Sequence, residues 1–439
     1  MLSWFLTGGG VLFALVLCGG FFMLYLRGLP LLRPRKMARI LGEEQPNGAS
    51  PARATFLALA GTLGVGNLVG VANAIAFGGA GAVFWMWVSA LFAMVLKYAE
   101  ILLAVRHRRV EKNGYFGGAP YYMKDYWQSR KKMRAAIILP CVFSIFLILN
   151  SLSMGCVIQV GAIASSASSA FSLPPLVVAA LLLLLVIPLA AKGTKEISAL
   201  TSYLVPIMSL GLLLLSIFLL FLRREVLGDV IRAIFRDAFS PESFSGGIFG
   251  FLTSRALRVG TMRGLLSNEA GCGTSPTAHA TSPTDYPAKQ GVWGIFEVFV
   301  DTLLLCTLTA LTILSSGADL SISDGMALTT AAYTSVLGPW ASYFLAAAVF
   351  AFGYATLLCW VNYGLESVRF LTNKKGWKHA YLSLFACSIL LGATPLAGRI
   401  WGISDFIIAV LTLINLATLF LMRREIGEET LRTFGQRSN

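Results

Sequence analysis

The chain has 439 residues, of which 56% are hydrophobic and only 13% are charged, and its mean hydropathy is +0.73. Soluble domains carry about 25% charged residues, so this composition excludes an ordinary soluble domain and indicates a lipid bilayer as the surroundings. The net charge of +14 does not indicate a nucleic-acid partner, because the basic residues lie in short loops between apolar stretches, as expected of cytoplasmic loops.

Eleven apolar segments are long enough to cross a bilayer, which requires about 20 residues. The first has no basic residue before it, so we interpret it as an uncleaved span rather than a signal peptide. The predicted spans are 8–26, 52–77, 81–104, 135–169, 174–191, 198–222, 246–279, 290–315, 337–370, 379–397 and 401–421.

The basic loops predict the orientation of these spans. Five basic residues follow the first span, between Arg27 and Arg39, and most later basic clusters fall on the same side. Loops 78–80 and 169–173, on the other side, have no Lys or Arg. We therefore expect a multi-pass protein of the plasma membrane, with the N-terminus outside and the C-terminus in the cytoplasm.

Two of the predicted spans are interrupted near their middle. The stretch Gly61–Ile75, GTLGVGNLVGVANAI, contains four glycines and the polar Asn67, and the stretch Ser267–Pro276 reads SNEAGCGTSP. Lipid does not satisfy exposed backbone, so unwound segments require protein or a watery cavity beside them. Helix-packing glycines are the alternative for either stretch alone. Two interrupted helices in corresponding halves of a chain are typical of a secondary transporter's substrate site.

The positions of the interruptions predict an internal repeat. An N-terminal transmembrane helix (1–30) precedes two sets of five helices, 50–222 and 246–422, and each set opens with an interrupted helix that runs opposite to the other. A connector (223–245) with a short surface helix is expected outside, and a tail (423–439) in the cytoplasm. We therefore predict an all-α integral membrane fold of eleven transmembrane helices, in which an N-terminal helix precedes a five-plus-five inverted repeat.

Cysteines and histidines give no sign of a catalytic or metal site. The seven cysteines occur singly in apolar segments, without a Cys-x-x-Cys spacing, so neither a disulfide framework nor a zinc knuckle is expected. The three histidines belong to no HExxH motif, and no GxSxG motif is present. We therefore do not expect an enzyme.

Several motifs resemble the alanine or glycine:cation symporter family. They are GGAGAVFWMWV (Gly78–Val88), KYAE (Lys97–Glu100), GAPYY (Gly118–Tyr122), RGLLSNEAG (Arg263–Gly271) and FEVFVDT (Phe296–Thr302). The resemblance implies the fold of amino-acid permeases and neurotransmitter symporters. It also implies sodium-coupled uptake of a small neutral amino acid, chiefly alanine or glycine, with sodium as the co-transported ion. We expect a monomer.

A zwitterionic substrate requires anion-binding and cation-binding groups close together. A broken helix supplies both, because one half exposes N–H groups and the other exposes carbonyls, and the amides near Gly64 to Asn67 should hold the carboxylate. For Gln159 and Trp360 the alternatives are an interhelical hydrogen bond and plain packing. The predicted substrate site is Thr62, Gly64, Val65, Gly66, Asn67, Gln159, Leu266, Ser267 and Trp360.

The predicted sodium site lies beside the first interruption. Carbonyls released at Ala60 and Leu63 can bind a hard cation, and the resemblance implies that Phe352 and Thr356 complete the site. Thr356 as a hydroxyl satisfied by its own helix is the alternative. Ala355 stands where the family has a second hydroxyl. Proton coupling, or a transporter-like receptor without a transport cycle, therefore remains an alternative function.

Intramembrane charges form a last group of candidates. We expect Arg263 and Glu269, beside the second interruption, to pair with each other or to cap the half-helices. Glu297 and Asp301 share one helix face at i, i+4. They can serve as a proton or cation relay or as partners of nearby arginines, and we favour the second. The charges of Lys97–Glu100 are expected near the cytoplasmic end as a gate or anchor.

Overall fold

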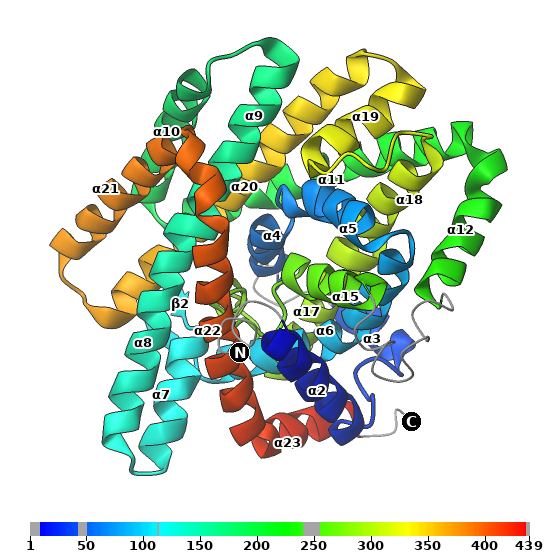
Figure 1. Ribbon diagram of the computed structural model, residues 1–439. Helices are drawn as coiled ribbons and strands as arrows, with labels where there is room; N and C mark the ends of the chain where they lie inside the picture. Colours follow the sequence, from blue (N-terminus) through cyan, green and yellow to red (C-terminus); the bar gives the residue numbers. More distant parts are fainter. Residues whose placement is uncertain (1–8, 43–50, 112–113, 240–254, 436–439) are drawn as a thin grey trace.

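The computed structural model describes residues 9–42, 51–111, 114–239 and 255–435. These residues are helical throughout, apart from loops and one short antiparallel pair, β1 (Arg109–Glu111) and β2 (Gly114–Phe116) (Figure 1). The predicted all-α class is confirmed. The part of the predicted connector from 240 to 245, and the first residues of the second predicted repeat (246–254), lie outside the described residues.

Seven described helices are long and apolar enough to cross a membrane, and an eighth is the bent pair α4–α5. The helix α2 (Gly9–Tyr25) is apolar but shorter, with 17 residues, and α21 (Lys375–Gly392) begins with a charged turn. The count of eleven therefore stays a prediction. The seven are α6 (Gly81–Arg106), the run Met133–Phe171, α10 (Pro175–Lys192), α11 (Thr194–Leu222), the run Pro287–Ser315, α20 (Trp340–Leu371) and α22 (Trp401–Leu421).

The first predicted interruption is present. The helix α4 (Pro51–Thr62) ends at Thr62, residues 63–65 are not helical, and the chain resumes as a π-helical turn, η1 (Gly66–Gly70), and α5 (Val71–Gly78). The two halves are bent by 56°. We call residues 63–65 the first break.

The second predicted interruption is also present and is longer. The helix α15 (Arg255–Ser267) is followed by residues 268–275 without helical structure and then by the short helix α16 (Pro276–His279). Three residues of this segment have positive φ, namely Glu269 (54°), Gly271 (78°) and Gly273 (75°). Such angles favour glycine, which explains two of the glycines in the motif. We call residues 268–275 the second break.

The described residues contain three π-helical turns, which the sequence did not predict. Besides η1, they are η2 (Ser153–Ile158), between α8 (Met133–Leu152) and α9 (Gln159–Phe171), and η3 (Phe299–Cys306), between α17 (Pro287–Val298) and α18 (Thr307–Ser315). A π turn is a local widening of the helix that occurs frequently at functional sites.

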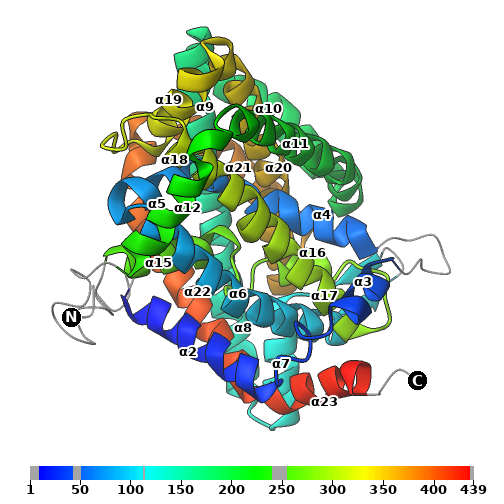
Figure 2. The ribbon, with the colours of Figure 1, turned by 90° about the vertical axis from the view of Figure 1, so that its right-hand side faces the viewer.

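Short helices complete the fold at both ends (Figure 2). The expected surface helix of the connector is α12 (Arg224–Ala238), and the tail forms α23 (Arg423–Phe434). The helices α3 (Pro34–Gly42), α7 (Ala119–Ser129) and α19 (Gly325–Leu337) were not predicted. In Figures 1 and 2, α7 and α23 lie at one end of the molecule and α19 at the other.

Burial separates central helices from those that face lipid. Within an 18-residue apolar stretch of each helix, 83% is buried in α6 and 72% in α20, against 28% in both α10 and α11. The outward side chains of the latter pair are apolar, as shown by Leu184 and Ile207, each 68% exposed. Both breaks pack against the central group, since α4 contacts α20 and α15 contacts α6.

Candidate functional site

A cavity of about 110 Å³ lies beside the first break. Four of the nine predicted substrate residues line it, namely Val65, Gly66, Gln159 and Ser267. The cavity therefore lies between the first break, the start of α9 and the end of α15. We call it the central cavity.

The unwound backbone of the first break touches two polar side chains. The Val65 N–H donates to Gln159 Oε1 at 3.4 Å. A Cβ atom at Gly64 would lie 3.0 Å from Thr356 Oγ1 and 3.2 Å from Gln159 Oε1. A methyl group at position 64 would therefore crowd both side chains.

The predicted sodium ligands converge on Thr356. Its hydroxyl lies 2.9 Å from the Ala60 carbonyl, across to α4, and 2.9 Å from the Phe352 carbonyl. The second contact is with the preceding turn of α20, the contact within its own helix that was the alternative for Thr356. The Gly64 N–H donates to the Thr62 carbonyl at 2.8 Å, not to the carbonyl of residue 60 as in a regular helix, so the break releases that carbonyl. Leu63, the fourth predicted ligand, is the first non-helical residue of the break. Oxygens of this kind suit a hard cation.

Asp301, in η3, links residues that flank the two breaks. Asn67, in η1 after the first break, donates from Nδ2 to Asp301 Oδ1 at 2.7 Å, and Ser267, the last residue of α15 before the second break, donates from Oγ to Oδ2 at 3.1 Å. The Thr302 hydroxyl also donates to Oδ2, at 2.8 Å. Asp301 and Asn67 are buried. The expected arginine partner of Asp301 is therefore wrong for the described residues, because neutral donors surround this carboxylate.

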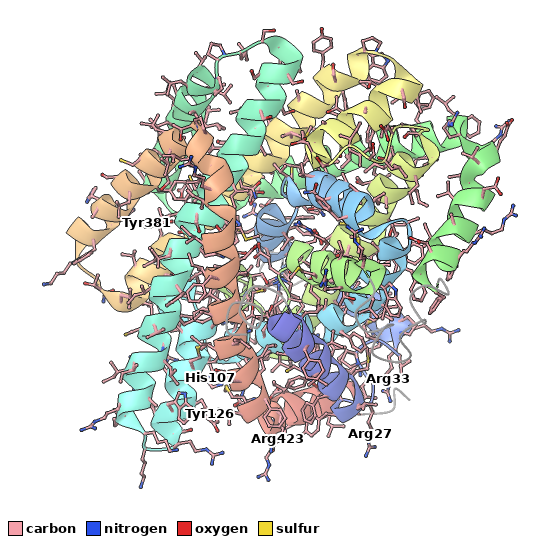
Figure 3. The ribbon with its side chains drawn as sticks, viewed as in Figure 1. Arg27, Arg33, His107, Tyr126, Tyr381 and Arg423 are labelled. Atoms are coloured by element: carbon pink, nitrogen blue, oxygen red, sulfur yellow. The ribbon has the colours of Figure 1, made fainter. Side chains whose placement is uncertain are left out.

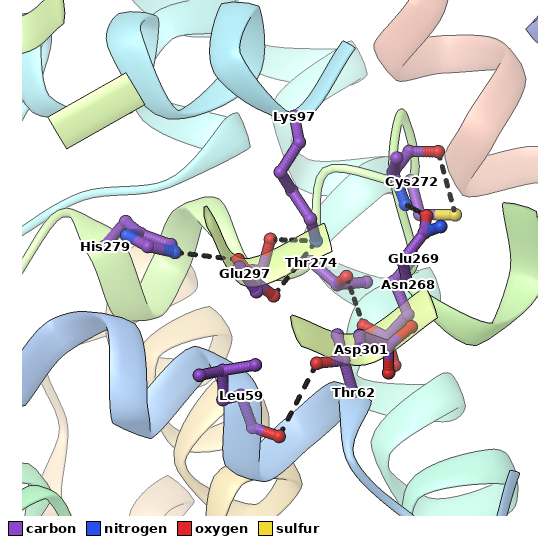
Figure 4. A network of polar contacts seen from close by, with 12 residues as sticks. Leu59, Thr62, Lys97, Asn268, Glu269, Cys272, Thr274, His279, Glu297 and Asp301 are labelled. Atoms are coloured by element: carbon purple, nitrogen blue, oxygen red, sulfur yellow. Dashed lines mark hydrogen bonds and ion pairs between the residues drawn. The ribbon is translucent and has the colours of Figure 1, made fainter. Parts of the chain in front are cut away.

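Glu297 has a lysine and a histidine as partners (Figure 4). Lys97 Nζ lies 3.3 Å from Glu297 Oε1 and donates to Ser275 Oγ at 2.6 Å, and His279 Nε2 lies 2.9 Å from Glu297 Oε2. All four side chains are buried. An arginine partner was expected for Glu297, and this expectation is wrong for the described residues, because Lys97 and His279 are its partners. The expected position of Lys97 near the cytoplasmic end stays a prediction.

The backbone of the second break is held by protein side chains. The Gly273 N–H donates to Glu100 Oε2 at 3.1 Å. Asn415, from α22, donates to the Gly271 carbonyl at 2.9 Å and to the same carboxylate oxygen at 2.9 Å. Glu269 accepts from Thr274 at 2.6 Å. Among the described contacts Glu269 has no ion pair with an arginine, so the expected pairing with Arg263 is not found.

Arg263 instead lines the central cavity together with Asp405, from α22. The two groups attract each other electrostatically, although they form no ion pair within 4 Å among the described contacts. Their opposite charges suit the two ends of a zwitterion. Sequence reasoning missed Asp405, and the signal was available, because a single acidic residue within an apolar span is a functional candidate.

A neighbouring cavity of about 320 Å³ shares Val69, Ile158 and Ala162 with the central cavity. It extends to Pro175, at the start of α10, and to Asp324, before α19. Both residues belong to the end of the molecule that is expected outside. The central cavity therefore adjoins a path toward that side.

The remaining predicted substrate residues do not line the central cavity. The Thr62 hydroxyl lies 3.5 Å from the Leu59 carbonyl of its own helix. Trp360 is 1% exposed, and a Cβ atom at Gly155 would lie 2.3 Å from its ring, so Trp360 packs against η2. The side chain of Leu266 lies outside the described residues. Their roles toward substrate stay predictions.

Comparisons with known proteins identify the family and the fold. A model of the sodium:alanine symporter family matches residues 2–438. The sodium/alanine symporter AgcS of Methanococcus maripaludis is 31% identical over 429 residues, which are 97% of this chain and 92% of the relative. The probable sodium/glutamine symporter GlnT of Bacillus subtilis is 31% identical over 93% of this chain and 84% of its own. The solved structure of MhsT in complex with L-phenylalanine has a TM-score of 0.58 at 17% identity, and the match covers 91% of this chain and 94% of that chain.

Proposed function

The chain belongs to the sodium:alanine symporter family, and from this premise we propose that it takes up a small neutral amino acid together with sodium. It is a multi-pass membrane transporter and not an enzyme. The observation that carries the finer proposal is the position of the Thr356 hydroxyl between the carbonyls of Ala60 and Phe352. It links the end of α4, next to the first break, to α20 at the point where the family resemblance implies a sodium site.

Sodium would bind to the carbonyls of Ala60, Leu63 and Phe352 and to the Thr356 hydroxyl. The Thr356 hydroxyl already lies within hydrogen-bond distance of two of these carbonyls, those of Ala60 and Phe352. All four ligands are neutral, so the bound ion brings one positive charge to the first break. That charge would favour the carboxylate of a substrate held by the adjacent amides.

The substrate would bind in the central cavity against the amides of the first break. The small volume, about 110 Å³, favours alanine or glycine over larger amino acids. Arg263 and Asp405 contribute one positive and one negative charge to its walls, so the walls favour a net neutral ligand. Both relatives named above support sodium coupling, but they differ in the amino acid.

Proton coupling is the second candidate, and two observations favour it. Ala355 lacks the hydroxyl that would complete the sodium site. In addition, Glu297 and Asp301 place buried carboxylates near the breaks, and such groups can exchange protons. A receptor without a transport cycle would bind the same substrate but would move neither ion.

For the arrangement in the membrane we propose eleven spans, an inverted repeat that contains the two breaks, and a monomer. We propose a plasma-membrane location, with the N-terminus outside and the C-terminus in the cytoplasm. Arg27, Arg33 and Arg423 lie at the same end of the molecule as His107 (Figure 3). This grouping of basic residues supports the orientation.

Uptake of labelled alanine into proteoliposomes tests the function. We expect an inward sodium gradient to drive accumulation, a proton gradient alone to drive none, and excess glycine, but not lysine or glutamate, to compete. Sodium-independent accumulation driven by a proton gradient would replace sodium by protons as the coupling ion. Binding of alanine without any uptake would identify a receptor.

The variant Thr356→Val tests the proposed ion site directly. It keeps the side-chain volume but removes the hydroxyl, so sodium-driven uptake should be abolished or severely weakened while alanine binding at saturating sodium persists. Thr309→Val is the matched control, because Thr309 is equally buried and its hydroxyl lies 3.0 Å from a carbonyl of its own helix. An equal loss of sodium-driven uptake in both variants would contradict a specific role for Thr356.

A further inference from the structure

A third and larger cavity lies at the end of the molecule that carries α23. Its volume is about 890 Å³, within the range of small-molecule sites, roughly 300–1,000 Å³. Its walls come from α3, the end of α6 and the residues after it, the start of α17, and α23. It shares no lining residue with the central cavity. We call it the basic cavity.

The walls of the basic cavity carry a large excess of positive charge. Among the described lining residues seven are cationic and two are acidic, so their formal charge is +5. If Glu425, which contacts Arg106 but does not line the cavity, is counted as well, the formal charge is +4. The cationic residues are Arg35, Lys36, Arg39, Arg106, Arg108, Lys289 and Arg432.

Both acidic residues of the walls already contact cations. Asp285 Oδ1 lies 3.5 Å from Arg108 Nη2. Glu429 forms ion pairs with Arg106 and Arg432. These acids therefore contribute no spare negative charge to the cavity, and the excess of positive charge remains.

Contacts between distant segments hold these like charges together. Lys36 donates to the Thr433 carbonyl and Arg33 donates to the Phe434 carbonyl, so α3 is tied to the end of α23. Arg108 donates to the carbonyl of Ser282, before α17. Clustered like charges repel one another, and a bound anion would offset that repulsion.

We propose that the basic cavity binds a phosphate-bearing anion. Five of its seven cations are arginines, and guanidinium groups bind phosphate oxygens through paired hydrogen bonds. Pro287, the first residue of α17, also lines the cavity, so the positive end of that helix dipole faces the ligand.

The location favours the headgroup of an anionic phospholipid as the source of the phosphate. Basic pockets beside membrane helices on the cytoplasmic side bind such headgroups, and the positive-inside pattern places this end in the cytoplasm. Tyr286, on the rim, is 60% exposed and has an aromatic ring typical of the membrane–water interface. A soluble phosphate has the same chemistry, so the test separates the two sources.

Lipid binding is tested on the purified full-length protein. We expect native mass spectrometry to detect phosphatidylglycerol or cardiolipin, but not phosphatidylcholine, retained after reconstitution in mixed vesicles. In the cavity variant Arg35→Gln/Arg432→Gln the affinity should fall roughly tenfold or more, because each basic residue near an anionic surface contributes about 1 kcal/mol. Both side chains are exposed, so folding should be unaffected.

The matched control is Arg134→Gln/Lys192→Gln. It removes the same charge from exposed positions outside the cavity, and the affinity for anionic lipid should stay within about twofold of the original. Equal weakening by both double variants would overturn the proposal, because it would show a general charge effect.

A second arm titrates lipid-stripped protein with inorganic pyrophosphate by calorimetry. Binding that the cavity variant alone loses, without lipid retention, would support the site and identify a soluble phosphate as its source. Neither lipid retention nor pyrophosphate binding, or binding that the cavity variant leaves unchanged, would overturn the proposal. None of these readouts depends on transport, so they are independent of the proposed symport.

Discussion

The two breaks interrupt their helices in similar sequence contexts but differ in what surrounds their backbone. The first is three residues long, and the side chains that touch it, Gln159 and Thr356, are neutral. The second is eight residues long, and Glu100, Lys97 and Asn415 bind its groups. Val65 of the first break also lines the central cavity, whereas none of residues 268–275 is among its described lining residues. We therefore interpret the first break as the binding element and the second as an anchored support.

The largest expected effect comes from removing a buried charge beside the second break. Lys97→Met would leave Glu297 without its cationic partner, and breaking a buried ion pair costs about 3–5 kcal/mol. We expect a large loss of folded protein, measured as the thermal midpoint in detergent. An exposed control, Lys192→Met, should unfold at the original temperature.

A double variant sharpens this result. Lys97→Met/Glu297→Gln removes both charges and should recover part of the lost stability, because neighbouring substitutions are not additive. If the support interpretation holds, the recovered protein should bind alanine. A well-folded double variant that no longer binds alanine would make the second break part of the binding site.

At the first break, two glycines should respond differently. A methyl group at Gly64 would crowd Thr356 and Gln159, whereas one at Gly66 would meet no atom within 4 Å. Overpacking costs about 1–3 kcal/mol, so Gly64→Ala should reduce alanine uptake tenfold or more. Gly66→Ala should retain uptake of glycine but reduce that of larger substrates, since Gly66 lines the central cavity. Equal uptake in both variants would show that close approach at Gly64 is unimportant.

A smaller effect is expected from adding a ligand to the proposed ion site. Ala355→Ser restores the hydroxyl that the family resemblance implies beside Thr356. A modest hydrogen bond contributes about 1 kcal/mol, so the sodium concentration for half-maximal uptake should fall several-fold. An unchanged value, together with normal uptake in Thr356→Val, would show that sodium does not bind here.

The smallest effect is expected from a partly exposed group of charged contacts around His107. Burial lowers the pKa of His107, but hydrogen bonds to Asp125 and Glu425 outweigh it, and the pKa is raised overall. Because the pKa is raised, the stability that these hydrogen bonds contribute is fully present below about pH 6.5, the pKa of the unfolded state. That stability is lost as the pH rises through the pKa of the folded state. Partly exposed pairs contribute about 1 kcal/mol at most.

The measurement is the thermal midpoint as a function of pH in His107→Gln. This variant should lose the part of the pH dependence that lies above the unfolded pKa of His107. His379→Gln is the control, because His379 is exposed and contacts only a carbonyl of its own helix among the described contacts. A stability change in the His107 variant as large as that of Lys97→Met would contradict the contrast between buried and exposed charges.

Sequence reasoning found both breaks because glycines and polar residues are costly inside an apolar span. It could not identify the partners of Glu297 and Asp301, because those partners come from α6, η1 and α15, and only the tertiary packing brings them together. Asp405 was missed although its signal is local, because it is an acidic residue within an apolar span. The number of spans stays open because α21 begins with charged residues and α2 is short.

The π turns η1, η2 and η3 have a consequence for comparing this chain with its relatives. Where such a turn lies inside a continuous helix, as η2 and η3 do, it behaves as one extra residue inserted into that helix. Everything beyond it is then rotated by about 100° relative to a regular helix of 3.6 residues per turn. Asn67 and Asp301 lie within such turns, and Gln159 directly follows one. A single-residue deletion in any of them would be nearly invisible in hydropathy, yet it would turn a site residue away from its partners. Relatives with such a gap should therefore be compared by helix phase rather than by position in an alignment.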